Sequence, residues 1–254
     1  MSRAGDYQKV KVLVRLDEGV GNLHYIYYLS TPGQNYLKEQ GMSDFSRVRK
    51  SDIEHMKYPH LEHVLSVNDF LIAAKLLPRF VPQITLASMF HDLELKKEPV
   101  KVTVDRRMPG GERVDEKVTI IPDGWLDFRY SMDNTSKPKR RCIVLELDRG
   151  TTSMTPFKQK IRAYYSYAIS EDYEALFGTQ LIMVAYATTA GEARRKQMQE
   201  WCEQELKQQR LEHEANLFRF TALPEGELDP KQVFCEPGWY KPYEDEPVSL
   251  LWKL

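Results

Sequence analysis

The chain has 254 residues, and its 36 Lys and Arg against 37 Asp and Glu give a formal net charge of −1 at pH 7. Hydrophobic residues make up 42% of it and charged residues 29%, the balance of an ordinary globular protein with a sizeable core. A net charge so close to zero excludes a uniformly basic nucleic-acid coat protein and an acidic disordered tail. Any function that depends on charge must therefore come from local patches.

Cysteine content and the lack of long apolar runs indicate a cytoplasmic protein. The three cysteines, Cys142, Cys202 and Cys235, are too few and too scattered for a disulfide framework or a zinc site. The N-terminus has no apolar segment typical of a secretory signal, and the longest apolar run, residues 181–187, is too short to cross a bilayer. We expect a soluble, cytoplasmic protein with no membrane partner.

The N-terminal segment predicts a β-hairpin followed by a short helix. Residues 10–29 alternate apolar and polar around a central Gly-Val-Gly-Asn. Thr31 and Pro32 begin a helix with a capping box, and the helix is expected to end near Gly41. A hairpin leading into a helix is the latter part of a winged-helix module, and the helix-turn-helix that should come first is missing. We therefore assign residues 1–50 to a partial winged-helix unit.

Residues 51–254 alternate between helical and strand-like patterns. An apolar stripe after Pro59 predicts a helix that ends at Pro78, and the all-apolar residues 181–187 predict a strand buried on both faces. The other expected elements are strands at 86–95, 119–129, 142–148, 217–221 and 233–235, a hairpin over 100–121, and helices at 156–170 and 189–213. This order predicts an α/β layer sandwich around a mixed central sheet.

Three carboxylates are candidates for a metal site. Side chains alternate along a strand, so Glu146 and Asp148 share one face while Leu145 and Leu147 occupy the other and require the core. If the neighbouring strand carries Asp123 at the same height, three anions meet, and they need a cation among them. Oxygen ligands of this kind suit Mg²⁺ or Mn²⁺. Such an ion activates water and polarises a phosphodiester.

A catalytic cation is expected on the following helix. Lys158 and Lys160 flank its apolar stripe from opposite sides, so periodicity does not choose between them.

A purely structural interpretation stands beside the metal site. In this interpretation Glu146 and Asp148 form ion pairs with Arg129, Arg141 or Arg149. Asp123 then only shapes a Pro-Asp-Gly turn, a sequence that is common in loops. Residue types alone favour this alternative. The succession of Pro-Asp, Glu-x-Asp and a lysine-bearing helix favours the metal site.

Basic clusters are candidates for contacts with the DNA backbone. Lys137, Lys139, Arg140 and Arg141 precede the Glu-x-Asp strand, where they would hold phosphates or lie in a merely solvated loop. The cluster at residues 194–196 lies on a charged helix and is expected to be solvated.

These motifs resemble the replication-relaxation family of plasmid and mobile-element proteins. The resemblance is carried by Tyr-Leu-Ser-Thr-Pro-Gly at 28–33, His-Val-Leu-Ser-Val-Asn-Asp-Phe at 63–70, Ile-Pro-Asp-Gly at 121–124, Leu-Glu-Leu-Asp-Arg-Gly-Thr at 145–151 and Lys-Ile-Arg-Ala-Tyr at 160–164. It extends over roughly residues 10–187, although each motif alone is short.

The resemblance implies a PD-(D/E)XK nuclease-like fold preceded by a winged-helix DNA-binding domain. It implies a metal-dependent phosphodiesterase ancestry, with Asp123 and Glu146 as metal ligands. The nuclease pattern expects Lys two residues after the Glu, where this chain has Asp148. Lys160 is the expected replacement because it falls in the family's Lys-Ile-x-x-Tyr stretch.

Two functions follow. The first is a Mg²⁺- or Mn²⁺-dependent DNA endonuclease of plasmid replication or mobilisation, with Asp123, Glu146 and Asp148 as ligands and Lys160 stabilising the transition state. The alternative is a catalytically inactive DNA-binding or partner-binding accessory protein on the same fold. Expected partners are DNA, replication or mobilisation proteins, and a second copy of the chain through the N-terminal hairpin.

Overall fold

A computed structural model describes residues 7–13, 23–29, 31–41, 58–108, 110–131 and 138–252. The chain divides into two compact units, residues 1–64 and 65–254. The boundary expected after residue 50 lies outside the described residues, so the division into domains 1–50 and 51–254 stays a prediction.

The first unit contains the expected hairpin and helix. Strands β1 (Tyr7–Leu13) and β2 (Leu23–Leu29) pair antiparallel, with Tyr7 opposite Leu29 and Leu13 opposite Leu23. Helix α1 (Thr31–Glu39) follows, and Gly41 just beyond its end adopts a left-handed φ of 79°. This is the conformation that favours glycine after a helix. The secondary structure predicted here is confirmed, whereas its winged-helix identity stays a prediction.

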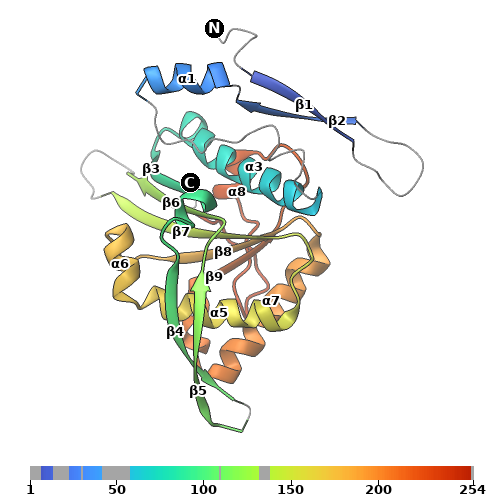
Figure 1. Ribbon diagram of the computed structural model, residues 1–254. Helices are drawn as coiled ribbons and strands as arrows, with labels where there is room; N and C mark the ends of the chain where they lie inside the picture. Colours follow the sequence, from blue (N-terminus) through green and yellow to red (C-terminus); the bar gives the residue numbers. More distant parts are fainter. Residues whose placement is uncertain are drawn as a thin grey trace. The chain divides into compact units, whose positions relative to one another are not determined.

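The second unit is built on a five-stranded mixed sheet (Figure 1) in the order β3-β6-β7-β8-β9. Strands β3 (Ile84–His91), β6 (Gly124–Tyr130) and β7 (Lys139–Asp148) pair antiparallel. Strands β8 (Met183–Thr188) and β9 (Phe218–Ala222) then continue the sheet parallel to β7. The mixed α/β class predicted from the sequence is confirmed.

Both faces of this sheet are buried, because successive side chains of β7 enter two different apolar clusters. Ile143, Leu145 and Leu147 join a cluster with α3 (Tyr58–Phe80) and α8 (Pro230–Phe234). Cys142 and Val144 join the other cluster, to which α5 (Met154–Ala168), α6 (Glu171–Phe177) and α7 (Glu192–Gln209) contribute. Glu146 and Asp148 lie on the α5 side of the sheet, as strand alternation requires.

A separate two-stranded ribbon runs beside α5 (Figure 1) and consists of β4 (Val100–Arg107) and β5 (Arg113–Ile120). It confirms the hairpin predicted over residues 100–121. Val102, Val104 and Ile120 anchor it in the cluster shared with α5.

Three strand predictions need correction. The strand expected at 86–95 ends at His91, and α4 (Asp92–Leu95) follows because the His91 side chain accepts from the Leu93 amide and caps it. Residues 230–234 form α8, which includes part of the strand expected at 233–235. The stretch at 119–129 is interrupted: residues 121–123 form an irregular connection between β5 and β6.

The short helix η1 (Glu212–Leu217) leads into β9. No helix among the described residues is long and apolar enough to cross a membrane.

Candidate functional site

Asp123 lies in the connection just before β6 and forms two hydrogen bonds with the backbone at the end of β7. Its backbone amide donates to the Leu145 carbonyl at 3.0 Å, and its Oδ2 accepts from the Leu147 amide at 2.8 Å. These two bonds flank Glu146 in the chain. The Pro-Asp-Gly turn therefore brings the Asp123 carboxylate to the strand that carries the other two acids.

Glu146 is buried in the α5 side of the sheet, where it is 4% exposed. Its Oε2 accepts from Lys160 Nζ at 2.5 Å, and its Oε1 accepts from the Tyr164 hydroxyl. Lys160 and Tyr164 are one turn apart on α5 and so present their side chains to the same carboxylate. Burial raises the pKa of Glu146, Asp123 raises it further, and Lys160 and Tyr164 oppose the rise.

Lys160 is the cation of this cluster. Burial by itself would lower the pKa of its ammonium, but the attraction of Glu146, Asp123 and Asp148 raises the pKa above its ordinary value. The Lys160 side chain is nevertheless 48% exposed, whereas that of Glu146 is 6% exposed. Lys158 instead donates to Gln204 at 3.0 Å. Of the two lysines that helical periodicity left open, Lys160 is therefore the one that contacts Glu146, and its catalytic role stays a prediction.

Asp148 has a different set of partners. Arg194 Nε donates to its Oδ2 at 2.7 Å and Arg194 Nη2 to its Oδ1 at 3.2 Å. The amides of Gly150 and Thr152 donate to Oδ2 and Oδ1 at 2.8 and 3.2 Å. Burial opposes ionisation, but these donors outweigh it and lower the pKa of Asp148.

The expectation that residues 194–196 form a solvated cluster is wrong for two of them. The Arg194 side chain is only 10% exposed, binds Asp148 and lies over the Trp201 ring at 4.9 Å. Arg195 is 3% exposed and lies 3.7 Å from the centre of the Tyr240 ring. Both arginines therefore belong to the interior contacts of α7, which residue type alone did not indicate.

Among the residues that the structure describes, no group of three or more His, Cys, Asp or Glu side chains is arranged to hold a metal ion. Asp123 and Glu146 share one electrostatic neighbourhood, whereas Asp148 is held by Arg194. Metal binding by these three residues stays a prediction.

Two of the four predicted DNA contacts, Arg140 and Arg141, have partners within the protein. Lys137 lies outside the described residues, and Lys139 is exposed at the start of β7. Arg140 forms an ion pair with Asp127, 3.0 Å between Nη2 and Oδ2, and this bonding raises the Arg140 pKa. The Arg141 guanidinium lies over the Trp252 ring at 5.6 Å. DNA binding by these residues stays a prediction.

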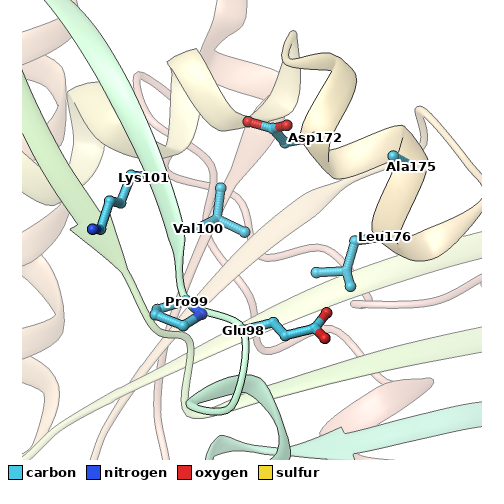
Figure 2. Close-up of a pocket in the computed structure, with 7 residues that line it drawn as sticks. All are labelled: Glu98, Pro99, Val100, Lys101, Asp172, Ala175 and Leu176. Carbon is cyan, nitrogen blue, oxygen red and sulfur yellow. The ribbon is translucent and has the colours of Figure 1, made fainter.

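A pocket of about 650 Å³ lies between the start of β4 and α6, and none of the three acids lines it (Figure 2). Its charged lining residues are Glu98, Lys101 and Asp172. None of the four predicted catalytic residues lines it, and we assign it no part in the site.

Tyr164 and Arg194 are the two contacts that sequence reasoning missed. Tyr164 follows Lys160 by four residues and so shares its face of α5, a spacing that the sequence already contains. Arg194 is 46 residues from Asp148, a separation at which no local pattern indicates pairing.

One family model matches the part of the chain that carries these residues. The family model described as replication-relaxation matches residues 5–181, more than half of the chain. The chain belongs to the replication-relaxation family. The match includes Asp123, Glu146, Asp148 and Lys160, and it ends before β8. Searches among curated proteins and among solved structures found no match.

Proposed function

We propose that the Asp123–Glu146–Lys160 cluster is a divalent-metal-dependent phosphodiesterase site acting on DNA, in a protein of plasmid or mobile-element replication or mobilisation. The observation that carries the proposal is the buried Glu146 carboxylate, which shares its surroundings with Asp123 and bonds a half-exposed lysine. Membership of the replication-relaxation family supports a replication-related role and DNA as partner.

The donor chemistry fits Mg²⁺ or Mn²⁺. Asp123 raises the pKa of Glu146, and a half-exposed lysine lies beside the two carboxylates, so a divalent cation bound there would relieve their repulsion. Mg²⁺ commonly binds through one or two carboxylates and completes its shell with waters and substrate phosphates. A third protein carboxylate is therefore not required.

Each residue then has a separate task. Asp123 and Glu146 would hold the ion, which when bound polarises the phosphodiester and activates water. Tyr164 holds one Glu146 oxygen in place. Lys160 is half-exposed and bonds Glu146, so its ammonium would stabilise negative charge on a phosphate bound beside that carboxylate. For Asp148 the contacts with Arg194, Gly150 and Thr152 support a role in holding the loop before α5 rather than that of a third ligand.

The order of the elements supports the PD-(D/E)XK part of the proposal. With α4, the β4–β5 ribbon and α6 set aside, helix α3 is followed by the antiparallel strands β3, β6 and β7, then by α5 and the parallel strand β8. This is the helix, three strands, helix and strand order expected of that fold. The hairpin β1–β2 with α1 is in turn compatible with a partial winged helix.

The test is cleavage of supercoiled plasmid in Mg²⁺ or Mn²⁺ by the full chain. We expect wild type to nick the plasmid, and Glu146→Gln and Asp123→Asn to lose the activity. Glu200→Gln is the matched control, because it makes the same carboxylate-to-amide change at an exposed position of α7. No cleavage by wild type, or equal cleavage by Glu146→Gln, would contradict the proposal.

An inactive DNA-binding or partner-binding protein is the second candidate. It is favoured by the saturation of the acids: Lys160 and Tyr164 occupy both Glu146 oxygens, and Arg194 neutralises Asp148. It predicts metal-free, salt-sensitive DNA retention with no cleavage. Lys139→Glu is the clean probe for weakened retention, because Lys139 is exposed whereas Arg140 is paired with buried Asp127. Light scattering tests the expected homodimer.

A further inference from the structure

Tyr186 lies beside the carboxylate cluster but forms none of its bonds. Strands β7 and β8 pair with Glu146 directly opposite Tyr186, so both side chains project from the same face of the sheet. Tyr186 is 2% exposed, in a strand otherwise made of apolar residues and a terminal Thr188. The only tyrosine of β8 is thus the next-strand neighbour of the central acid.

The Tyr186 ring is held from several sides. It stacks on Phe220 at 5.5 Å between centroids, and contacts Phe157 at 5.0 Å and the edge of Tyr164 at 6.3 Å. Such a packed ring cannot turn its hydroxyl toward a new partner without disturbing the core. The position of the hydroxyl is therefore set by the fold.

The Tyr186 hydroxyl is buried and has no hydrogen-bond partner among the residues that the structure describes. Two other tyrosines of the same cluster do have partners: the Tyr164 hydroxyl donates to Glu146, and the Tyr173 hydroxyl donates to the Leu181 carbonyl at 2.7 Å. Burying a hydroxyl without a hydrogen bond is costly, so such a group in a folded protein requires an explanation.

The missing partner is not one of the acids. The Tyr186 hydroxyl bonds neither Glu146 nor Asp123, whose carboxylates accept from Lys160, Tyr164 and the Leu147 amide. Burial, and next Glu146, raise the pKa of Tyr186, so the hydroxyl is neutral and within electrostatic range of the site. A neutral hydroxyl both donates and accepts, which suits a water molecule.

We propose that Tyr186 is a positioning residue of the carboxylate site, whose hydroxyl binds a water molecule of the hydrated divalent cation held by Asp123 and Glu146. This inference rests on the proposed function and adds to it a residue outside the family match. Partners of this kind, one step removed from the ion, commonly change metal affinity by 10- to 100-fold when they are mutated.

The experiment is a Mn²⁺ titration of the full chain, with free Mn²⁺ followed by electron paramagnetic resonance. Tyr186→Phe is expected to weaken Mn²⁺ binding by roughly 10-fold or more. It should not lower the melting temperature of the metal-free protein, because the lost hydroxyl bonds none of the described residues. Tyr167→Phe is the matched control, since it removes a hydroxyl from another buried tyrosine of the same cluster. It should leave Mn²⁺ affinity unchanged.

A double variant tests the route of the effect. If Tyr186 acts through the ion, adding Tyr186→Phe to Glu146→Gln should cause little further loss of Mn²⁺ affinity, whereas independent effects would multiply.

The outcomes separate the two proposals. Wild type that binds no Mn²⁺ overturns the proposed function. Wild type that binds Mn²⁺, with Tyr186→Phe of equal affinity, overturns the role of Tyr186 alone. A marked fall in the melting temperature of metal-free Tyr186→Phe also overturns it, because the hydroxyl would then have a partner inside the protein.

Discussion

Two buried acids two residues apart on β7, Glu146 and Asp148, face the same side of the sheet and yet have opposite surroundings. Glu146 meets a lysine and a tyrosine, and burial dominates, so its pKa is raised. Asp148 receives an arginine fork and two backbone amides, so its pKa is lowered. Neighbouring carboxylates whose environments separate their pKa values commonly have different roles. In the proposed function Glu146 would exchange a protein partner for the cation, whereas Asp148 would keep its contacts with Arg194 and the backbone amides.

The sharpest way to break this comparison is to remove Arg194. Arg194→Ala leaves the Asp148 carboxylate buried without its counter-charge, and breaking such a buried pair typically costs about 3–5 kcal/mol of the free energy of unfolding. Urea unfolding measures it. Lys196→Ala, an exposed lysine on the same helix, is the control and should change little. A loss below about 1 kcal/mol would show that the pair is no structural clamp.

Removing the Tyr164 hydroxyl tests the Glu146 side. Tyr164→Phe takes a donor from a buried carboxylate, and we expect a loss of about 1–3 kcal/mol in the free energy of unfolding. The adjacent Tyr165→Phe is the matched control, because Tyr165 is only partly buried. Equal unfolding midpoints for the two variants would argue against a hydrogen bond that supports Glu146.

The two acids should affect stability with opposite pH dependence. The native state holds the Glu146 proton more tightly than the unfolded chain, so its contribution is present below the ordinary pKa of 4.5 and is lost as pH rises through the folded pKa. Asp148 contributes above its ordinary pKa of 3.8, and that contribution is lost as pH falls through the lower folded pKa.

Urea unfolding across pH checks both signs. Glu146→Gln should flatten the decline in stability above pH 4.5, and Asp148→Asn should flatten the loss below pH 3.8. If both variants change stability only above pH 4.5, or both only below pH 3.8, the opposite pH dependence of Glu146 and Asp148 is refuted.

The smallest effect is expected at the start of the same strand. Lys139 is exposed, so Lys139→Glu should change the free energy of unfolding by no more than about 0.5 kcal/mol. Any weakening of DNA retention in this variant would then report a contact with phosphate and not a loss of folding. A large loss of stability would mean that Lys139, like Arg140, has a structural partner.

Much of the local structure could be predicted from the residues. Strand alternation is a property of the backbone, so Glu146 and Asp148 had to share a face opposite Leu145 and Leu147, as they do. The apolar residues 181–187 likewise predicted the buried β8, although the structure begins that strand at Met183. The Lys-Ile-x-x-Tyr stretch singled out Lys160, which is the lysine that contacts Glu146.

The partners of these acids were decided by tertiary structure. The packing of α7 places Arg194 beside Asp148, although the two are 46 residues apart in the sequence. The pairing of β8 with β7 places Tyr186 opposite Glu146. The same cause turned Arg140 inward to Asp127. Periodicity fixes the direction in which a side chain leaves the backbone, because φ and ψ repeat locally. What that side chain meets depends on which distant segments pack against it, and no short window of sequence contains that information.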